Sequence, residues 1–441
     1  MSKTFLTLTA LIVFAWTGSA SAEFQLDVKE FQLGNGLTIL MLENHTAPVI
    51  TYFTFYKVGA RNERRDNSGI SHFFEHMYFN GAAKYGPGMF DQALESKGGE
   101  NNAYTSKNVT AYYENFPTEA LDLVLDLEAD RMSSLALVEE KVKSESGVVS
   151  EERLVSTDND NEGIIYEELY ATAYMAHAYE GPVLGWMESI KNFNRPDCVE
   201  YFKTYYAPNN AVVAIVGDID VEQTLAKMKQ YLGGLPSGPP PPKVPRYEPE
   251  QRGAKRVFLE REAEHEHIMR AYHIGDKDSP DLYTLEIIQF ILCSGESSRL
   301  HQTLVNDLQL ALYQYGGFEW GFDPELFYYY VAVAPGIGYD KAEKALDSVL
   351  TELTVNGPTE AELQKAKNSL TANFYKNFKT NNGTAHDLAR YKTLYGDWKA
   401  MYNFVPGVSA VTAQQVKEVM AKYFKAKNST TVTLVPEGGQ S

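Results

Sequence analysis

The sequence predicts an α+β protein made of two related α/β-sandwich units that a proline-rich linker joins. The linker, residues 236–250, contains four consecutive prolines, which favour extended polyproline II structure and cannot continue a helix or a central strand. The parts on either side, residues 23–235 and 251–441, read alike. Each opens with strand-like apolar runs, enters a helical pattern, and closes with a helix followed by a strand. This parallel order suggests a duplicated unit.

The elements of the two units follow from hydrophobic periodicity and turn residues. The first unit is predicted to hold strands at residues 31–33, 38–42, 49–56 and 211–216, and helices at 68–80 and 198–206. The second is predicted to hold strands at residues 256–259, 267–274 and 430–435, and helices at 280–293 and 413–423. Asn35-Gly36 lies between the first two strands and predicts a hairpin turn, because such turns need positive φ.

The first 22 residues have the composition of a secretory signal peptide. Lys3 precedes an apolar run at residues 6–16, and Ala20-Ser21-Ala22 has the form of a cleavage site. The run is short for a membrane span, although an N-terminal anchor is the alternative. No later run is long enough to span a membrane. We therefore expect export, most simply to a periplasm.

The net charge of the chain argues against nucleic acid as its partner. The chain has 441 residues and a formal net charge of -18, which argues against nucleic-acid binding because phosphate contacts need a basic surface. An acidic surface favours solubility, and it also suits basic peptide substrates. The two cysteines, Cys198 and Cys293, lie far apart in apolar segments and are predicted to be buried hydrophobic side chains rather than a disulfide.

The segment around His72, Glu75 and His76 contains candidate metal ligands and a candidate catalytic base. On a helix, residues four apart share a face, so His72 and His76 can direct both imidazoles at one metal ion. Glu75 lies on nearly the same face and can reach a water on that ion, which is the arrangement that metal-assisted hydrolysis needs. Ser68 or Ser71 is the expected cap of this helix. The alternative is a helix face that carries two hydrated histidines and an acid.

A catalytic zinc usually has three protein ligands, so a third is required. The order H-x-x-E-H, inverted from H-E-x-x-H, resembles the pitrilysin/insulinase family of zinc peptidases. In that family the third ligand is a glutamate about 76 residues after the second histidine, a spacing that Glu152 meets here. Its neighbour Glu151 is the competing candidate. Glu145, two helical turns before Glu152, would orient a ligand histidine.

The resemblance extends to a strand that would bind substrate. The run Asn101-Asn102-Ala103-Tyr104-Thr105-Ser106 is similar to the family's N-A-Y-T-S segment. In the family that segment is an edge strand, which grips an extended peptide through its backbone. The resemblance implies that Asn102, Ala103 and Tyr104 bind the substrate. Without it, the run is simply rich in strand-forming residues.

One segment departs from the family pattern. The family's second domain supplies an arginine and a tyrosine within S-R-L-x-x-x-L-R-E-x-x-G-L-A-Y, but here Val305 stands at the arginine position and Leu312 at the tyrosine position. Tyr313 comes one residue late and would replace the tyrosine only with a local bulge. We therefore expect a homologous subunit that supplies the pair, or a homodimer.

Taken as a whole, the resemblance implies two domains that close like a clamp around a chamber and a zinc-dependent endopeptidase that uses Glu75 as its base. The chain would be the metal-bearing subunit of a heterodimer. Two alternatives are a non-catalytic structural or assembly subunit, and a zinc hydrolase of non-peptide substrates.

Overall fold

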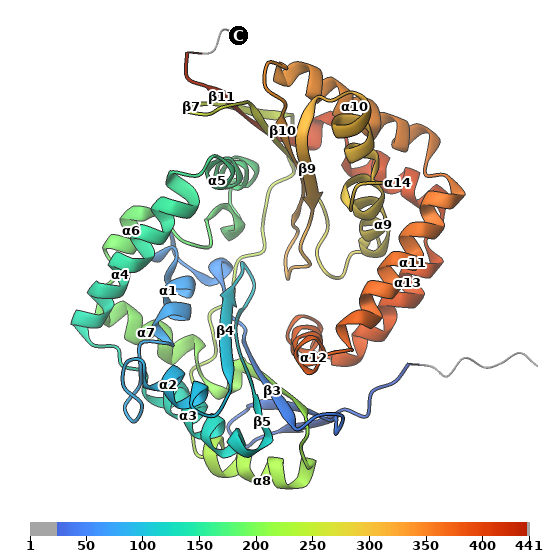
Figure 1. Ribbon diagram of the computed structural model, residues 1–441. Helices are drawn as coiled ribbons and strands as arrows, with labels where there is room; N and C mark the ends of the chain where they lie inside the picture. Colours follow the sequence, from blue (N-terminus) through green and yellow to red (C-terminus); the bar gives the residue numbers. More distant parts are fainter. Residues whose placement is uncertain (1–23, 439–441) are drawn as a thin grey trace, which may run out of the picture.

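The computed structural model describes residues 24–438, so the predicted signal peptide at residues 1–22 lies outside the described part. The N-terminal half, blue to green in Figure 1, and the C-terminal half, yellow to red, face each other, and each contains one β-sheet flanked by helices. Within the described residues, no helix is long and apolar enough to cross a membrane.

The first half contains a six-stranded sheet in the order β1-β2-β6-β3-β5-β4. Its strands are β1 (Lys29–Gln32), β2 (Thr38–Glu43), β3 (Val49–Tyr56), β4 (Glu100–Thr105), β5 (Thr110–Pro117) and β6 (Ala211–Gly217). The predicted hairpin joins β1 to β2, and Gly36 has the positive φ that the turn requires, +90°. Among the described strands β4 pairs only with β5 and therefore forms one edge of the sheet.

The second half contains a five-stranded sheet in the order β7-β11-β8-β10-β9. Its strands are β7 (Lys255–Arg261), β8 (His267–His273), β9 (Ala311–Gly317), β10 (Leu326–Val333) and β11 (Ser429–Pro436). In each sheet the last strand pairs in parallel with an early strand, β6 with β2 and β11 with β7, and the other pairs that these sheets share are antiparallel. The prediction of two related α+β units is thus confirmed.

Helices cover both faces of each sheet. The first half contributes α1 (Ile70–Met77), α2 (Met89–Glu95), α3 (Leu121–Ser134), α4 (Glu139–Arg153), α5 (Asn161–Ala173), α6 (Met187–Lys191), α7 (Arg195–Tyr205) and α8 (Val221–Leu232). The second half contributes α9 (Leu282–Cys293), α10 (Tyr339–Asn356), α11 (Glu360–Asn377), α12 (Asn381–Tyr395), α13 (Phe404–Ala410) and α14 (Ala413–Tyr423). Cys198 on α7 and Cys293 on α9 are buried and unpaired, as predicted.

Two helices cross from one half to the other. α12 packs on β3 and β6 of the first sheet, where Leu388 joins a core with Phe53 and Val212. In return, α5 packs on β8 and β11 of the second sheet, where Leu169 joins a core with Met269. Each half therefore completes the core of the other.

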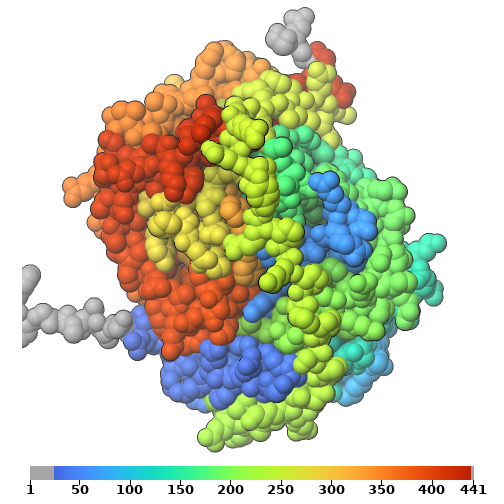
Figure 2. Space-filling view, turned by 180° about the vertical axis from the view of Figure 1, so that it is seen from behind, coloured from blue at the N-terminus to red at the C-terminus, as the bar shows by residue number. Residues whose placement is uncertain are grey.

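The predicted linker, residues 236–250, contains no helix or strand. Seen from behind, it runs as a yellow-green band over the surface where the two halves meet (Figure 2). Arg246 of this segment reaches the fully buried carboxylate of Asp323 in the second half, with 2.5 Å between Nε and Oδ1. Arg61 donates to the other oxygen of Asp323 through Nε at 2.8 Å, and His177 Nε2 lies 3.2 Å from the same oxygen. Asp323 therefore ties both halves and the linker together.

Burial alone would raise the pKa of Asp323, but the hydrogen bonds from His177 and Arg61 outweigh it and lower the pKa to about 2. Because the folded-state pKa lies below the unfolded value of about 3.9, the charged carboxylate stabilises the fold above about pH 4, and this contribution is lost as the pH falls toward 2.

We predict that Asp323→Asn destabilises the protein by about 3 kcal/mol at pH 7, since it leaves two guanidinium groups without their carboxylate. The difference in urea unfolding free energy between wild type and variant should shrink as the pH falls from about 5 to 2. Asp340→Asn, which removes an exposed pair with Lys344, is the control and should cost less than about 1 kcal/mol. A pH-independent difference would contradict the assigned role of the Asp323 charge.

Candidate metal centre

Helix α1 carries the three residues of the H-x-x-E-H motif. Ile70, Phe73, Phe74 and Met77 bury its apolar face in the first core. His72 and His76 lie instead toward Glu152 of α4. The helix begins two residues later and ends three residues earlier than predicted.

The start of α1 differs from the expectation that Ser68 or Ser71 caps it. Gly69 occupies the cap position at φ +90°, where an added Cβ would lie 2.4 Å from the carbonyl oxygen of Leu184. The Glu63 carboxylate accepts from the backbone N–H groups of Gly69 at 2.6 Å and Ser71 at 2.8 Å. The prediction was wrong because the cap comes from a loop residue six positions before Gly69, whereas local capping patterns place it within the first turn.

The end of α4 brings a carboxylate to the two histidines. The Glu152 oxygens lie 3.6 Å from Nε2 of His72 and 3.1 Å from Nε2 of His76. One ligand atom from each of the three residues lies within 4.8 Å of the others. Glu151, the competing candidate, is exposed on α4 and takes no part in this cluster. Buried Arg153 fixes this end of α4, because it donates to Glu167 of α5 at 2.7 Å and to the carbonyl of Gly185 at 2.6 Å.

The three groups fit a zinc ion. Two imidazoles and one carboxylate form a donor set common in catalytic zinc sites, and three protein ligands leave one position open for water. Burial lowers the pKa of His72 to about 4, so its ring is neutral and has a lone pair available. Burial acts on His76 in the same direction, but its hydrogen bonds to Glu145 and Glu152 outweigh it and raise its pKa to about 9. These carboxylates therefore favour a cation at this position.

Glu145 lies behind His76, on the side away from Glu152. Its Oε1 lies 2.9 Å from Nδ1 of His76, which directs Nε2 of that ring at Glu152. The other oxygen of Glu145 accepts from Nδ2 of Asn80 at 2.6 Å. Burial opposes ionisation of Glu145, but the two hydrogen bonds outweigh it and lower its pKa. Sequence reasoning found Glu145 and missed Asn80, which lies beyond the end of α1.

Glu75 lies on α1 between the two histidines and interacts electrostatically with His76 and Glu152. Its Oε2 accepts a hydrogen bond from Oγ1 of Thr105 at 2.6 Å. Burial raises the pKa of Glu75, and the bond from Thr105 opposes that rise. A half-buried carboxylate with a raised pKa suits a general base. The role of Thr105 was missed, although the residue belongs to the N-A-Y-T-S run that the sequence comparison singled out.

The proposed substrate residues lie on β4, at the edge of the sheet. Within residues 24–438, the backbone N–H and C=O groups on its outer side have no strand partner, which is the arrangement that accepts an added strand. Asn102 is exposed, and its Oδ1 accepts from the N–H of Ala103 at 2.8 Å. Tyr104 packs across to α12, where its hydroxyl lies 3.1 Å from Nε2 of His386.

The segment that departs from the family pattern has unusual backbone geometry. Val305 lies in a π-helical turn (His301–Asp307) and packs against the second core, and Gln309, at the family's glycine position, has φ +52°. In β9 the pairing with β10 skips Leu312, since Ala332 pairs with Tyr313 and Val333 with Ala311. The bulge that Tyr313 requires is therefore present. The Tyr313 hydroxyl lies 3.4 Å from Glu162 of α5, on the face of the second sheet that α5 covers.

The comparisons with known proteins agree with this geometry. The sequence model of the family described as "Insulinase (Peptidase family M16)" matches residues 38–185, and the one described as "Peptidase M16 inactive domain" matches residues 192–370. Zinc protease PqqE of Helicobacter pylori is 30% identical and aligns over 98% of this chain and 99% of its own length.

Two solved structures share the fold. A protease from Helicobacter pylori superposes with a TM-score of 0.90 at 29% identity, covering 93% of this chain and all of that one. The periplasmic protease PqqL from Escherichia coli superposes with a TM-score of 0.76 at 18% identity, covering 94% of this chain and 48% of that one, a likeness of fold alone.

The duplicated fold, the H-x-x-E-H helix and the full-length similarity to PqqE together assign the chain to the insulinase family of peptidases.

Proposed function

We propose that this protein is a zinc-dependent endopeptidase that cleaves peptides or unfolded polypeptides. The observation that carries the proposal is the gathering of His72, His76 and Glu152 around one point, with Glu75 near enough to interact electrostatically with His76 and Glu152. The zinc proteases among the relatives support the choice of metal. The predicted signal peptide supports a periplasmic location.

His72, His76 and Glu152 would hold the zinc, and Glu145 would keep His76 oriented toward it. When bound, zinc supplies Lewis acidity, which polarises a carbonyl and acidifies water. A substrate strand paired with β4 would lie beside Glu75, because Thr105 at the end of β4 donates a hydrogen bond to the Glu75 carboxylate. Glu75 would take a proton from the attacking water and pass it to the leaving amine. Asn102, Ala103 and Tyr104 would position the peptide.

The alternative function is a non-catalytic structural or assembly subunit, and the metal motif argues against it. The second half contains no copy of it: α9 follows β8 as α1 follows β3, yet α9 has no histidine. The first half has both histidines, Glu75 as the proposed base and Glu152 as the third ligand. A subunit with a purely structural role would need none of these groups to converge.

We predict that Glu152→Gln lowers zinc affinity more than Glu145→Gln, for which the expected loss is about 10–100-fold. Glu151→Gln is the matched control and should bind zinc as the wild type does, because its side chain lies outside the cluster. Zinc titration against a competing chelator, with circular dichroism to confirm folding, gives the affinities of the wild type and the three variants. Equal losses for Glu151→Gln and Glu152→Gln would remove Glu152 as the ligand.

We predict that Glu75→Gln lowers the rate of peptide hydrolysis by about 10²–10⁴ while zinc stays bound. The amide can still accept the bond from Thr105 but cannot take a proton from water. Cleavage of a mixed set of quenched fluorescent peptides measures the rate, and elemental analysis measures the metal. An unchanged rate in this variant would refute the assignment of the base.

We further propose that the chain is the metal-bearing subunit of a heterodimer, since Val305 cannot replace an arginine. Loss of one oxyanion donor costs about 10²–10³ in rate. The purified chain alone should therefore cleave slowly, and co-expression with a homologous chain that carries both the arginine and the tyrosine should raise kcat/KM by about that factor. Tyr313→Phe in the isolated chain shows whether the bulged tyrosine already contributes. Full activity without a partner, with no gain on adding one, would end the heterodimer proposal.

A further inference from the structure

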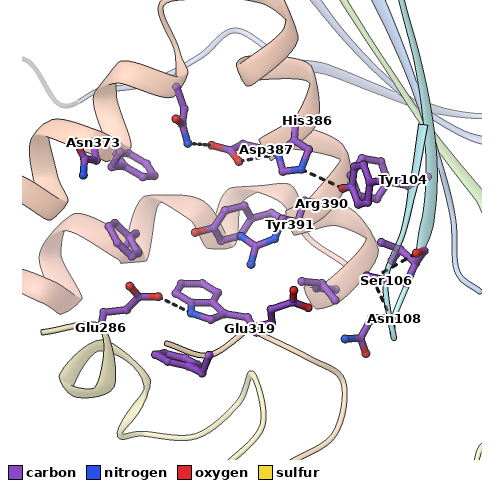
Figure 3. A pocket seen from close by; sticks show the side chains of 18 of the residues that line it. Tyr104, Ser106, Asn108, Glu286, Glu319, Asn373, His386, Asp387, Arg390 and Tyr391 are labelled. Carbon is purple, nitrogen blue, oxygen red and sulfur yellow. Dashed lines mark hydrogen bonds and ion pairs between the residues drawn. The ribbon is translucent and has the colours of Figure 1, made fainter. Parts of the chain in front are cut away.

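A cavity of about 590 Å³ lies between β4 and the C-terminal half (Figure 3). β4 and the turn after it contribute Tyr104, Thr105 and Ser106, and the rest of the lining comes mainly from α9, α11, α12 and residues 318–320. The lining includes none of the proposed metal ligands. It does include Thr105, the partner of Glu75, so the cavity begins next to the proposed base.

β4 presents its side chains alternately to two environments. Thr105 and Ala103 lie on the side of α1, where Thr105 bonds Glu75 and Ala103 packs against the first core. Tyr104 lies on the opposite side and contacts His386 of α12. A peptide strand added to β4 would follow the same pleat. Every second side chain of the peptide would then point toward the cavity, while the others would point toward the metal side.

The lining has more acidic than basic side chains. It contains three carboxyl groups and one guanidinium, that of Arg390. Glu286 accepts from Nε1 of Trp320 at 2.6 Å, and Asp387 accepts from Asn377 at 3.2 Å. Glu319 is exposed and has no hydrogen bond or ion pair within the described residues, although Lys107 attracts its charge, so its oxygens can accept from a ligand.

The one guanidinium of the lining offsets only part of this acidity. Arg390 lies over the ring of Trp320, 5.2 Å from its centroid, and acts electrostatically on Glu286 without forming an ion pair among the described residues. Trp320, Tyr391, Phe318 and Phe404 add apolar and aromatic surface. Such surface packs against the aliphatic stem of a long side chain and attracts a cation to the ring faces, while Glu319 can neutralise the charge.

We propose that this cavity is a subsite for an arginine or lysine side chain of a peptide bound along β4. The inference rests on the proposed function, because it takes a peptide as the substrate. It adds residues of the C-terminal half, Glu319 and Glu286, as determinants of which peptides bind.

The test measures peptide binding to Glu75→Gln, so that it does not depend on cleavage. Fluorescent peptides carry arginine, citrulline, norleucine or glutamate at one position at a time. Citrulline matches arginine in shape and lacks its charge. Arginine should bind about two- to five-fold more tightly than citrulline at positions that alternate along the peptide, the range that an exposed ion pair gives. Adding Glu319→Gln should remove the preference, and adding Arg390→Gln should increase it.

Glu222→Gln, an exposed change of the same charge on α8, is the control and should keep the preference for arginine. Equal binding of arginine and citrulline peptides, a preference that survives Glu319→Gln, or no binding of any peptide would overturn the proposal. A preference for glutamate that Arg390→Gln removes would assign the cavity to acidic side chains instead.

Parallel cleavage assays with the wild type separate this inference from the proposed function. Cleavage without any arginine preference in binding would refute the subsite alone. Binding with the expected preference but without cleavage, even after co-expression with the homologous chain, would refute the peptidase and leave the subsite standing.

Discussion

The structure depends on the burial of both faces of each sheet by helices from both halves. Neither half can complete this burial alone, because α12 of the second half covers one face of the first sheet and α5 of the first half covers one face of the second. Burial of apolar surface is the main favourable term in folding, so the exchange binds the halves into one cooperative structure. The central strand β6 is buried at every position, and its sequence is an unbroken apolar run because helices cover both of its faces.

This exchange of helices also positions the candidate metal ligand Glu152 and the cavity beside β4. α5 follows directly on α4 and the short π-helical turn after it, so the docking of α5 on the second sheet anchors the end of α4 that carries Glu152. The buried pair of Arg153 and Glu167 strengthens that anchor. On the other side, the docking of α12 on the first sheet brings His386 to Tyr104 and forms one wall of the cavity beside β4. The metal centre and the cavity thus result from one packing arrangement.

The sequence predicted what local spacing and turn chemistry encode. The four-residue spacing of His72 and His76 determined that they share a face of α1, and Asn35-Gly36 determined the first hairpin. Glu152 came from a family spacing, and the structure brings it to the histidines while Glu151 stays exposed. Local patterns could not reveal the Glu63 cap, the bond from Thr105 to Glu75 or the crossing of α5 and α12, because each depends on residues that only the tertiary fold brings together.

The duplication explains why the two halves differ in chemistry. In the first half the helix after the third strand carries two histidines that meet Glu152, whereas α9, its counterpart in the second half, is mostly apolar and has no histidine. The second half instead presents the bulged start of β9 and the acidic lining of the cavity. Three residues before the bulged Leu312, Gln309 adopts a left-handed conformation that glycine adopts at lower cost. Such strain persists only where the surrounding structure enforces it, and here the bulge that follows presents Tyr313 on the face of the sheet that α5 covers.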